Sequence, residues 1–192
     1  LPVELTRLPL IESCFNVRAY SKVGAAGIWQ FMPGTGRLYM RVDDAVDERR
    51  DPIASTHAAA QHLKRNYEVL GTWPLAITAY NHGRAGIARA VSQVGTTDIV
   101  EIIQHYHGPS FKFASRNFYA EFLAALDVER HFSDYFGDLK GHAPMRSETV
   151  RVPDYVTFQT LVRVTDTDPD TLANLNPALS REVIAGKVRV PK

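Results

Sequence analysis

Cysteine is almost absent from this chain of 192 residues, which contains only Cys14. An internal disulfide and a zinc site built on paired cysteines are therefore excluded. Long apolar runs are also absent: the longest, Phe122–Leu126, has five residues, against the roughly 18 to 20 that span a bilayer. We therefore expect no transmembrane segment in this chain.

The chain also lacks an excess of charge of one sign, because its 22 Lys and Arg residues are balanced by 21 Asp and Glu residues. No basic face for nucleic acid is indicated, so nucleic acid is not an expected partner. The start of the chain shows no basic residues followed by an apolar stretch, so no export signal is visible. Since the chain opens at Leu1 without Met, we expect a processed or trimmed piece.

The composition is 45% hydrophobic and 22% charged, which is typical of a globular protein. The length fits one domain, or one domain with a small appendage. Apolar residues recur at helical spacing as far as Phe136, and the clearest pattern starts at Asp51 and Pro52 and stops before Gly71. The expected helices cover residues 52–70, 73–80, 85–94, 97–106 and 115–132. We expect a mainly helical domain over residues 1–142.

The pattern changes between Gly137 and Pro144, where glycine and proline interrupt the helical spacing. Beyond that point, alternating residues at 148–152 and 187–191 predict strands, and Asp168 opens a short helix over 169–175. We therefore expect a small α+β module, strand–helix–strand, over residues 143–192.

Glu12 is the first candidate for chemistry, because it follows the apolar run Leu8–Ile11 at the end of an expected helix. Apolar surroundings disfavour the ionised form of a carboxyl group, which raises its pKa and allows proton donation near neutral pH. The alternative is a surface glutamate on an amphipathic helix. The local sequence leaves both open.

Glycines and apolar residues surround one amide in the segment Gly24–Pro33, whose sequence is GAAGIWQFMP. Gln30, with Phe31 and Met32, which are capable of being exposed, would suit the floor of a groove for sugar rings, which stack on apolar surfaces and pair with amides. The alternative is a buried turn and core helix.

A third segment, Ala79–Gly83, places a tyrosine and an amide at the end of a helix. Tyr80 can donate its hydroxyl proton to a carboxylate, and Asn81 offers a donor and an acceptor. The alternative is that Asn81 and Gly83 only cap the helix.

These three segments, in this order and spacing, resemble the catalytic domain of the family 1 lytic transglycosylases, a lysozyme-like domain related to goose-type lysozyme. The likeness covers residues 1 to about 136 and is greatest to the membrane-bound lytic transglycosylase D type. The C-terminal module is loosely similar to LysM. The resemblance implies cleavage of peptidoglycan between N-acetylmuramic acid and N-acetylglucosamine.

The resemblance also implies roles for individual residues. Glu12 matches the catalytic acid and base, and Ser13 matches a hydroxyl in the groove. Gln30 and Met32 match residues that line the sugar subsites, and Phe31 lies between them. Tyr80 and Asn81 match residues that hold and polarise the catalytic carboxyl. One carboxylate suffices, because the substrate's acetamido group can take the place of the nucleophile. The resemblance implies no metal and no organic cofactor.

The chain departs from the family pattern at three positions. His82 stands where the family has a small residue after Ala-Tyr-Asn. The later pattern Glu-Thr-Arg-x-Tyr-Val is replaced by one that has Ala114 for the glutamate and Phe118 for the tyrosine. We therefore expect an altered glycan preference, for instance in N-acetylation or stem peptide, and place His82 among the substrate-binding residues.

Three further features have ordinary interpretations. Cys14, next to Glu12, is expected to be a small buried packing residue. His105 and His107 are expected to be a surface pair, because residues two apart on a helix point in different directions. The acidic run from Asp43 to Glu48 predicts a solvated loop or, alternatively, a rim that attracts cationic sugar.

The leading hypothesis is a monomeric peptidoglycan-cleaving enzyme of the periplasm or cell envelope. Its product has a 1,6-anhydro end if the sugar's own 6-hydroxyl attacks, or a reducing end if water attacks, and both remain open. The alternative is an inactive peptidoglycan-binding or scaffold module.

Overall fold

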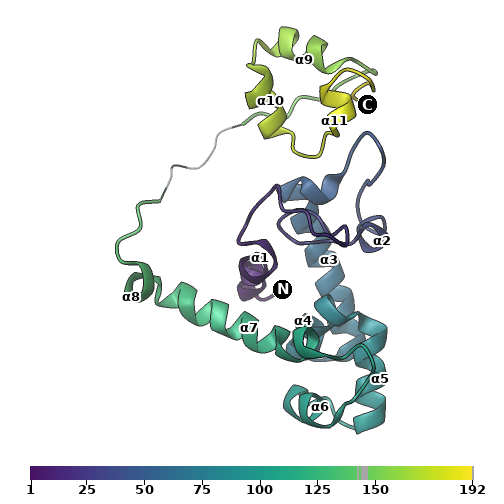
Figure 1. Ribbon diagram of the computed structural model, residues 1–192, viewed down its shortest axis with the longest axis vertical. Helices are drawn as coiled ribbons and strands as arrows, with labels where there is room; N and C mark the ends of the chain where they lie inside the picture. Colours follow the sequence, from purple (N-terminus) through teal and green to yellow (C-terminus); the bar gives the residue numbers. More distant parts are fainter. Residues whose placement is uncertain (142, 144–146, 192) are drawn as a thin grey trace. The chain divides into compact units, whose positions relative to one another are not determined.

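The computed structural model describes residues 1–141, 143 and 147–191 (Figure 1). The chain divides into two compact units. The first unit contains Leu1–Ile11 and His57–Asp138, and the second contains Glu12–Thr56 and Leu139–Lys192. Each is described below by itself, and the expected domain division at residues 142 and 143 stays a prediction.

Helices dominate both units, and β pairing among the described residues is limited to isolated bridges. The helices are η1 Val3–Arg7, α1 Leu8–Ser13, α2 Pro33–Gly36, η2 Glu48–Arg50, α3 Pro52–Leu70, α4 Trp73–His82, α5 Arg84–Val94, α6 Ile99–His105, α7 Phe113–Arg130, α8 Phe132–Phe136, α9 Phe158–Thr165, α10 Pro169–Leu175 and α11 Arg181–Ile184. Within the described residues, none of these helices combines the length and the apolarity that crossing a bilayer requires.

The long helix α3 has the boundaries that the sequence predicts. The carboxylate of Asp51 accepts hydrogen bonds from the backbone N–H groups of Ile53 and Ala54, both at 2.8 Å. These contacts satisfy two of the N–H groups that a helix start leaves unpaired. Gly71, with φ of +79°, follows the last turn.

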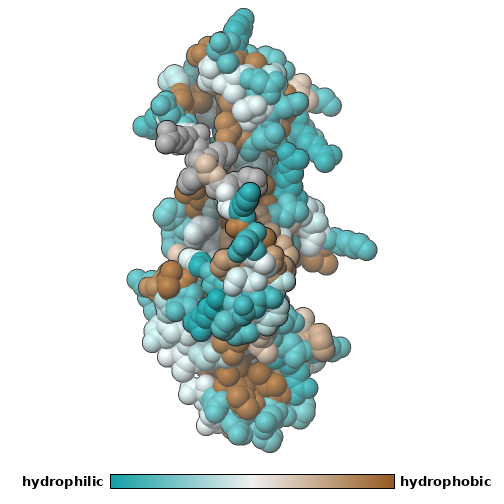
Figure 2. Space-filling model, turned by 90° about the vertical axis from the view of Figure 1, so that its left-hand side faces the viewer, coloured by the Kyte–Doolittle hydropathy of each residue, from teal (hydrophilic) through white to brown (hydrophobic). Residues whose placement is uncertain are grey.

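The core of the first unit lies between α4, α5, α6 and α7. Leu75, Ala79, Ile87 and Ile102 are completely buried there. α4 packs against both α5 and α7, so the end of α4 is held between these two helices. Large apolar side chains that stay exposed form separate brown patches among hydrophilic residues on the face drawn in Figure 2.

The C-terminal segment is more helical than expected. Residues 169–175 form the predicted helix α10, and residues 158–165 form another helix, α9, where the sequence predicted no helix. The expected strands at 148–152 and 187–191 are wrong: within the described part of the C-terminal segment, the one bridge that joins two of its own residues is the antiparallel bridge between Val156 and Val190.

The reason is that Phe158, Leu161 and Val162 follow helical spacing and cluster with buried Val183. The hydroxyl of Thr157 accepts from the Thr160 N–H at 3.1 Å and starts α9. Helices α9, α10 and α11 lie next to one another within the C-terminal segment (Figure 1).

Candidate functional site

Glu12 lies one residue before the end of α1 and is half-buried. The next residue is anchored, because the Ser13 hydroxyl donates to the carbonyl oxygen of Ile28 at 2.9 Å. The chain then reverses through Cys14 and Phe15, whose φ angles are +50° and +58°. The helix end that carries Glu12 is thereby tied to the Gly24–Pro33 segment, and the Ser13 hydroxyl has a structural partner that the sequence did not indicate.

The Gly24–Pro33 segment is a folded turn, as the alternative interpretation expected in part. Antiparallel bridges join Tyr20 to Ala26 and Ala26 to Phe31, and the next helix, α2, begins at Pro33. Gln30 has φ of +48°, and its side-chain Nε2 donates to the carbonyl oxygen of Gly27 at 2.8 Å. The amide of Gln30 is therefore oriented by the turn that carries it.

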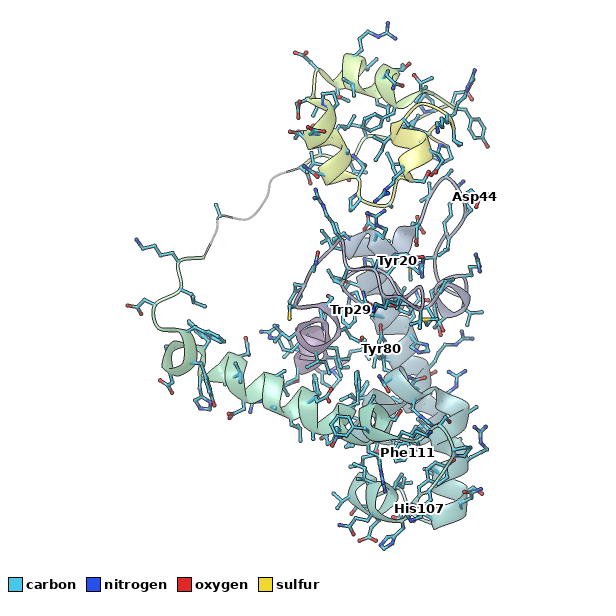
Figure 3. All side chains as sticks on the ribbon, in the orientation of Figure 1. Tyr20, Trp29, Asp44, Tyr80, His107 and Phe111 are labelled. Atoms are coloured by element: carbon cyan, nitrogen blue, oxygen red, sulfur yellow. The ribbon has the colours of Figure 1, made fainter. Side chains whose placement is uncertain are left out.

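Exposure separates the two residues that follow Gln30. Met32 is 43% exposed, as expected for a surface that meets a ligand. The expectation that Phe31 is exposed is wrong, because its ring is only 3% exposed and lies 6.5 Å from the ring of Tyr39. Trp29, labelled in Figure 3, is also buried, and its indole N–H donates to the Thr56 hydroxyl at 2.8 Å.

Arg49 organises this segment and was not indicated by the sequence reasoning. Its Nη1 donates to the carbonyl oxygens of Gly24 at 2.7 Å and Phe31 at 2.8 Å. Its Nε and Nη2 donate to the two carboxylate oxygens of Asp47 at 2.8 Å and 2.7 Å. Burial lowers the pKa of Arg49, but Asp47 and Tyr20 together outweigh this and the net pKa is raised. The signal available was the Asp47–Arg49 pair inside the acidic run.

The acidic run is more than a solvated loop or an attractive rim. Asp43 accepts from Arg41 Nε at 2.6 Å and from the backbone N–H groups of Ala45 and Val46. The hydrogen bond from Arg41 is the main reason that the pKa of Asp43 is lowered. These carboxylates shape the loop that carries Arg49.

In the first unit, the end of α4 forms a hydrogen-bonded group with the start of α7. The Ser115 hydroxyl donates to Asn81 Oδ1 at 3.1 Å and lies 3.0 Å from His82 Nδ1. Gly83, with φ of +91°, ends α4 as the capping interpretation expects. Asn81 does not cap the helix through its side-chain oxygen, which is instead paired with Ser115.

The ring of His82 packs against Gly86 and Phe111. A Cβ atom at Gly86 would lie 2.5 Å from His82 Cδ2, so only glycine leaves room for the ring. The ring meets Phe111 edge-on at 5.1 Å between centroids. Burial, with a smaller contribution from the charge of Arg89, lowers the pKa of His82. The imidazole that departs from the family pattern is therefore packed, in surroundings that favour its neutral form.

Tyr80 is half-buried and has an imidazole neighbour that the sequence reasoning missed. The His62 ring meets the Tyr80 ring edge-on, with 5.4 Å between centroids. Burial, with the nearby charges of Arg84 and Arg65, lowers the pKa of His62 to about 4. The spacing of His62 along α3 gave no signal, because the partner ring comes from another helix.

The other two departures from the family pattern lie on α7. Ala114 is exposed, and Phe118 is buried in the core of the first unit. Phe118 thus contributes packing where the family has a hydroxyl.

The expectation for Cys14 is wrong. Cys14 is exposed and lies just past the end of α1, because the left-handed turn points the chain out of the helix there.

His105 pairs with Glu101 at 3.3 Å on the surface of α6. Across the described residues, no group of three or more His, Cys, Asp and Glu side chains is arranged to hold a metal ion.

A shallow cavity of about 780 Å³ lies where α6 leads into α7, around the labelled His107 and Phe111 in Figure 3. None of the site residues that the sequence predicts lines this cavity.

The predicted site residues are divided between the two units. The structure places Glu12, Ser13, Gln30, Phe31 and Met32 in the second unit. Tyr80, Asn81 and His82 belong to the first unit.

Comparison with known proteins identifies the class of this domain. Among solved structures, the 70 kDa soluble lytic transglycosylase Slt70 from Escherichia coli matches with a TM-score of 0.57 and 23% identity, over 69% of this chain and 22% of that chain. This likeness confirms the predicted fold class, a mainly helical, lysozyme-like domain.

The family follows from the sequence. The model of the transglycosylase SLT domain matches residues 1–103, more than half of the chain, so the chain belongs to this family. It is 42% identical over 93 residues to membrane-bound lytic murein transglycosylase D of Escherichia coli (strain K12), covering 47% of this chain and 21% of that protein. It is 39% identical over 98 residues to the putative tributyltin chloride resistance protein of Alteromonas sp. (strain M-1), covering 49% of this chain and 46% of that protein.

The matched stretch is therefore about a fifth of the length of the Escherichia coli relative and less than half of the Alteromonas relative. The family match ends at residue 103, so the LysM-like character of the C-terminal segment stays a prediction.

Proposed function

We propose that this chain cleaves the glycan strands of peptidoglycan at the β-1,4 bond between N-acetylmuramic acid and N-acetylglucosamine. The observation that carries the proposal is the family match over residues 1–103, which includes Glu12 and the Gly24–Pro33 segment. The name of the Escherichia coli relative, a lytic murein transglycosylase, agrees with it. The activity needs no metal or organic cofactor.

Glu12 is the single catalytic acid and base in this proposal. It protonates the glycosidic oxygen and then takes a proton from the attacking oxygen. If that oxygen is the sugar's own 6-hydroxyl, the product is a 1,6-anhydro sugar, and if it is water, the product is a reducing end. The substrate's acetamido group takes the place of a second carboxylate.

The turn after Glu12 supplies contacts to sugar. Because Gln30 Nε2 is engaged by Gly27, the amide presents its Oε1 as the acceptor for a hydroxyl or acetamido N–H. The exposed Met32 offers an apolar surface, whereas buried Phe31 supports the turn from inside. Tyr80 and Asn81 serve the same reaction, as the family resemblance implies.

The test is digestion of purified peptidoglycan by wild type and Glu12→Gln, with the released sugars identified by mass spectrometry. Glutamine keeps the shape of glutamate but has no transferable proton, so release should fall by at least about a hundredfold. Anhydro ends lost in the variant establish a lytic transglycosylase, and reducing ends establish a lysozyme. Undiminished release by Glu12→Gln contradicts the proposed role.

A second candidate function, an inactive peptidoglycan-binding or scaffold module, is favoured by the replacements at His82, Ala114 and Phe118. The same experiment separates the two. A binding module retains sacculi in a pull-down but releases no sugar, and Glu12→Gln then changes neither result.

The same replacements support an altered glycan preference. Ala114 removes a carboxylate from an exposed position on α7, and His82 adds an imidazole at the end of α4. We expect native and de-N-acetylated peptidoglycan to be cleaved at different rates, and Ala114→Glu with His82→Ala to move the ratio toward the native substrate. Equal turnover of both substrates by wild type contradicts this preference.

The substrate implies that the protein works in the periplasm or cell envelope, and we expect it to be a monomer. Fractionation of cells that express the full-length precursor, with the mass in solution measured by light scattering, tests both statements. Recovery in the cytosol, or a dimer at micromolar concentration, contradicts them.

A further inference from the structure

The C-terminal segment Val156–Pro191 lies outside the family match, and its contacts suggest a role for it. Its residues Ala178–Ser180 run along the loop residues Ala45–Asp47 in the second unit. The Asp47 N–H donates to the Ala178 carbonyl oxygen at 2.8 Å, and the Ser180 N–H donates to the Ala45 carbonyl oxygen at 3.0 Å. An antiparallel bridge joins Val46 to Leu179 between them. We refer to this pairing of 45–47 with 178–180 as the docking edge.

Apolar packing reinforces the docking edge. Ala45 packs against the small core of the C-terminal segment, which consists of the buried residues Phe158, Val183 and Val190. The guanidinium of Arg18 also donates to the side-chain oxygen of Asn174 on α10. Backbone pairing, apolar burial and a side-chain bond therefore act together, which is the arrangement of a fixed element and not of a tethered module.

The docking edge connects directly to the turn that carries Gln30. Asp47, whose backbone is held by Ala178, directs both carboxylate oxygens to Arg49. Arg49 in turn bridges the carbonyl oxygens of Gly24 and Phe31, which bracket the turn at its two ends. Since the guanidinium is only 3% exposed, it is stable there only with its carboxylate in place.

We infer that the C-terminal segment is a positioning element for the Gly24–Pro33 turn, acting through Asp47 and Arg49. The assignment of this turn to sugar binding rests on the proposed function, but the mechanical coupling does not. Loss of the docking edge frees Asp47, weakens the Arg49 bridge and loosens Gln30. The segment thus affects turnover through the shape of the turn and not through an affinity of its own for peptidoglycan.

The test is Ala45→Glu in the full chain, with Asp44→Glu as the matched control. Both variants introduce the same side chain at neighbouring positions, but Ala45 faces the apolar core of the C-terminal segment and Asp44 is exposed. We expect amide hydrogen exchange over residues 24–33 to accelerate by about tenfold or more in Ala45→Glu and to stay unchanged in Asp44→Glu.

The two tryptophans give a second readout. The indole N–H of Trp29 donates to Thr56 inside the second unit, whereas Trp73 stacks on Tyr67 in the first. Ala45→Glu should shift and speed exchange of the Trp29 indole signal in NMR spectra and leave that of Trp73 unchanged. An unchanged Trp73 signal also shows that the first unit of the variant is folded.

Asp47→Asn tests the link between the docking edge and Arg49, because it keeps the backbone of the docking edge but removes the charge that pairs with Arg49. Exchange over residues 24–33 should accelerate as in Ala45→Glu. If peptidoglycan is the substrate, both variants should lower kcat more than they raise KM, with binding to sacculi retained.

Exchange over residues 24–33 that is unaffected in both variants overturns the inference. Loss of sacculus binding in Ala45→Glu with an unaltered turn overturns it too, and indicates an affinity module instead. Absence of any peptidoglycan cleavage in wild type refutes the proposed function but leaves the exchange measurements valid, so the two failures are distinguishable.

Discussion

The Nδ1 atom of His82 and the hydroxyl oxygen of Ser115 lie 3.0 Å apart, and the same hydroxyl contacts Asn81 Oδ1. Ser115 donates its only hydroxyl proton to Asn81 Oδ1, so its oxygen is the acceptor toward His82. In the tautomer that satisfies both contacts, His82 carries its proton on Nδ1. This relationship joins the end of α4 to the start of α7 and sets the orientation of the ring that replaces the family's small residue.

Ser115→Ala should release this ring. Without the acceptor, we expect His82 to populate both neutral tautomers, and the free energy of unfolding to fall by about 1 kcal/mol. The ¹⁵N shifts of the His82 ring in long-range NMR spectra measure the tautomer, and urea unfolding measures the stability. Ser92→Ala, at an exposed position on α5, is the control. A His82 spectrum that is the same in Ser115→Ala as in wild type contradicts the assigned hydrogen bond.

His62 should make the stability of the protein depend on pH. Its pKa falls from 6.5 in the unfolded chain to about 4 in the folded protein, so the unfolded chain binds more protons between these values. Its contribution is complete above pH 6.5 and is lost as the pH falls toward 4. Between pH 7 and pH 4.5 the loss is about 2 kcal/mol.

Urea unfolding of wild type and His62→Gln at these two pH values isolates this contribution. Between pH 7 and pH 4.5, the free energy of unfolding of His62→Gln should fall by about 2 kcal/mol less than that of wild type. His105→Gln changes an exposed histidine and should follow wild type. Parallel pH profiles for wild type and His62→Gln disagree with the burial of a neutral imidazole beside Tyr80.

Gly27→Ala should be among the most damaging substitutions in the second unit. A Cβ atom there would lie 1.8 Å from the carbonyl oxygen of Arg49, and the residue has φ of +75°. We expect a loss of more than about 3 kcal/mol, because left-handed strain adds to a clash with backbone. Gly95→Ala is the control, since φ there is +79° but nothing lies within 4 Å of the new atom.

The control should show only the conformational strain, about 1 to 2 kcal/mol. Chemical denaturation of both variants gives the comparison. Equal losses at the two glycines would mean that the turn and the Arg49 backbone are not in the close contact described.

Asp51→Ala should weaken the start of α3. Two backbone N–H groups lose their acceptor, so the expected decrease in the free energy of unfolding is about 1 kcal/mol. Asp51→Asn keeps a side-chain oxygen in the same place and should cost only a few tenths of a kcal/mol. A similar decrease for both variants, measured by urea unfolding, speaks against capping as the cause.

The main helices were predictable because their signals are local. Asp51, Pro52 and Gly71 mark both ends of α3 through rules that involve only neighbouring residues, and Glu12 was correctly expected at a helix end. The exposure of Phe31 was not predictable in this way. Its burial depends on Tyr39 and on Arg49, which come from other turns of the chain.

The C-terminal segment shows the same limit. Its β-branched residues favour strands locally, but burial of Phe158 against Val183 selects the helical period. Intrinsic β propensity is weak compared with the packing of a small core, so the tertiary contact decided the outcome.

By itself, the sequence determined the mainly helical class, the boundaries of the long helices and the order of the motifs that place the chain in its family. These depend on spacing and on residue type, which a linear chain carries in full. Only the tertiary structure decided that Arg49 bridges Gly24 and Phe31, that Ser115 orients His82, and that residues 178–180 pair with residues 45–47. Each of these joins residues that are distant in sequence, and their partners are selected by the burial of polar groups that the fold must satisfy.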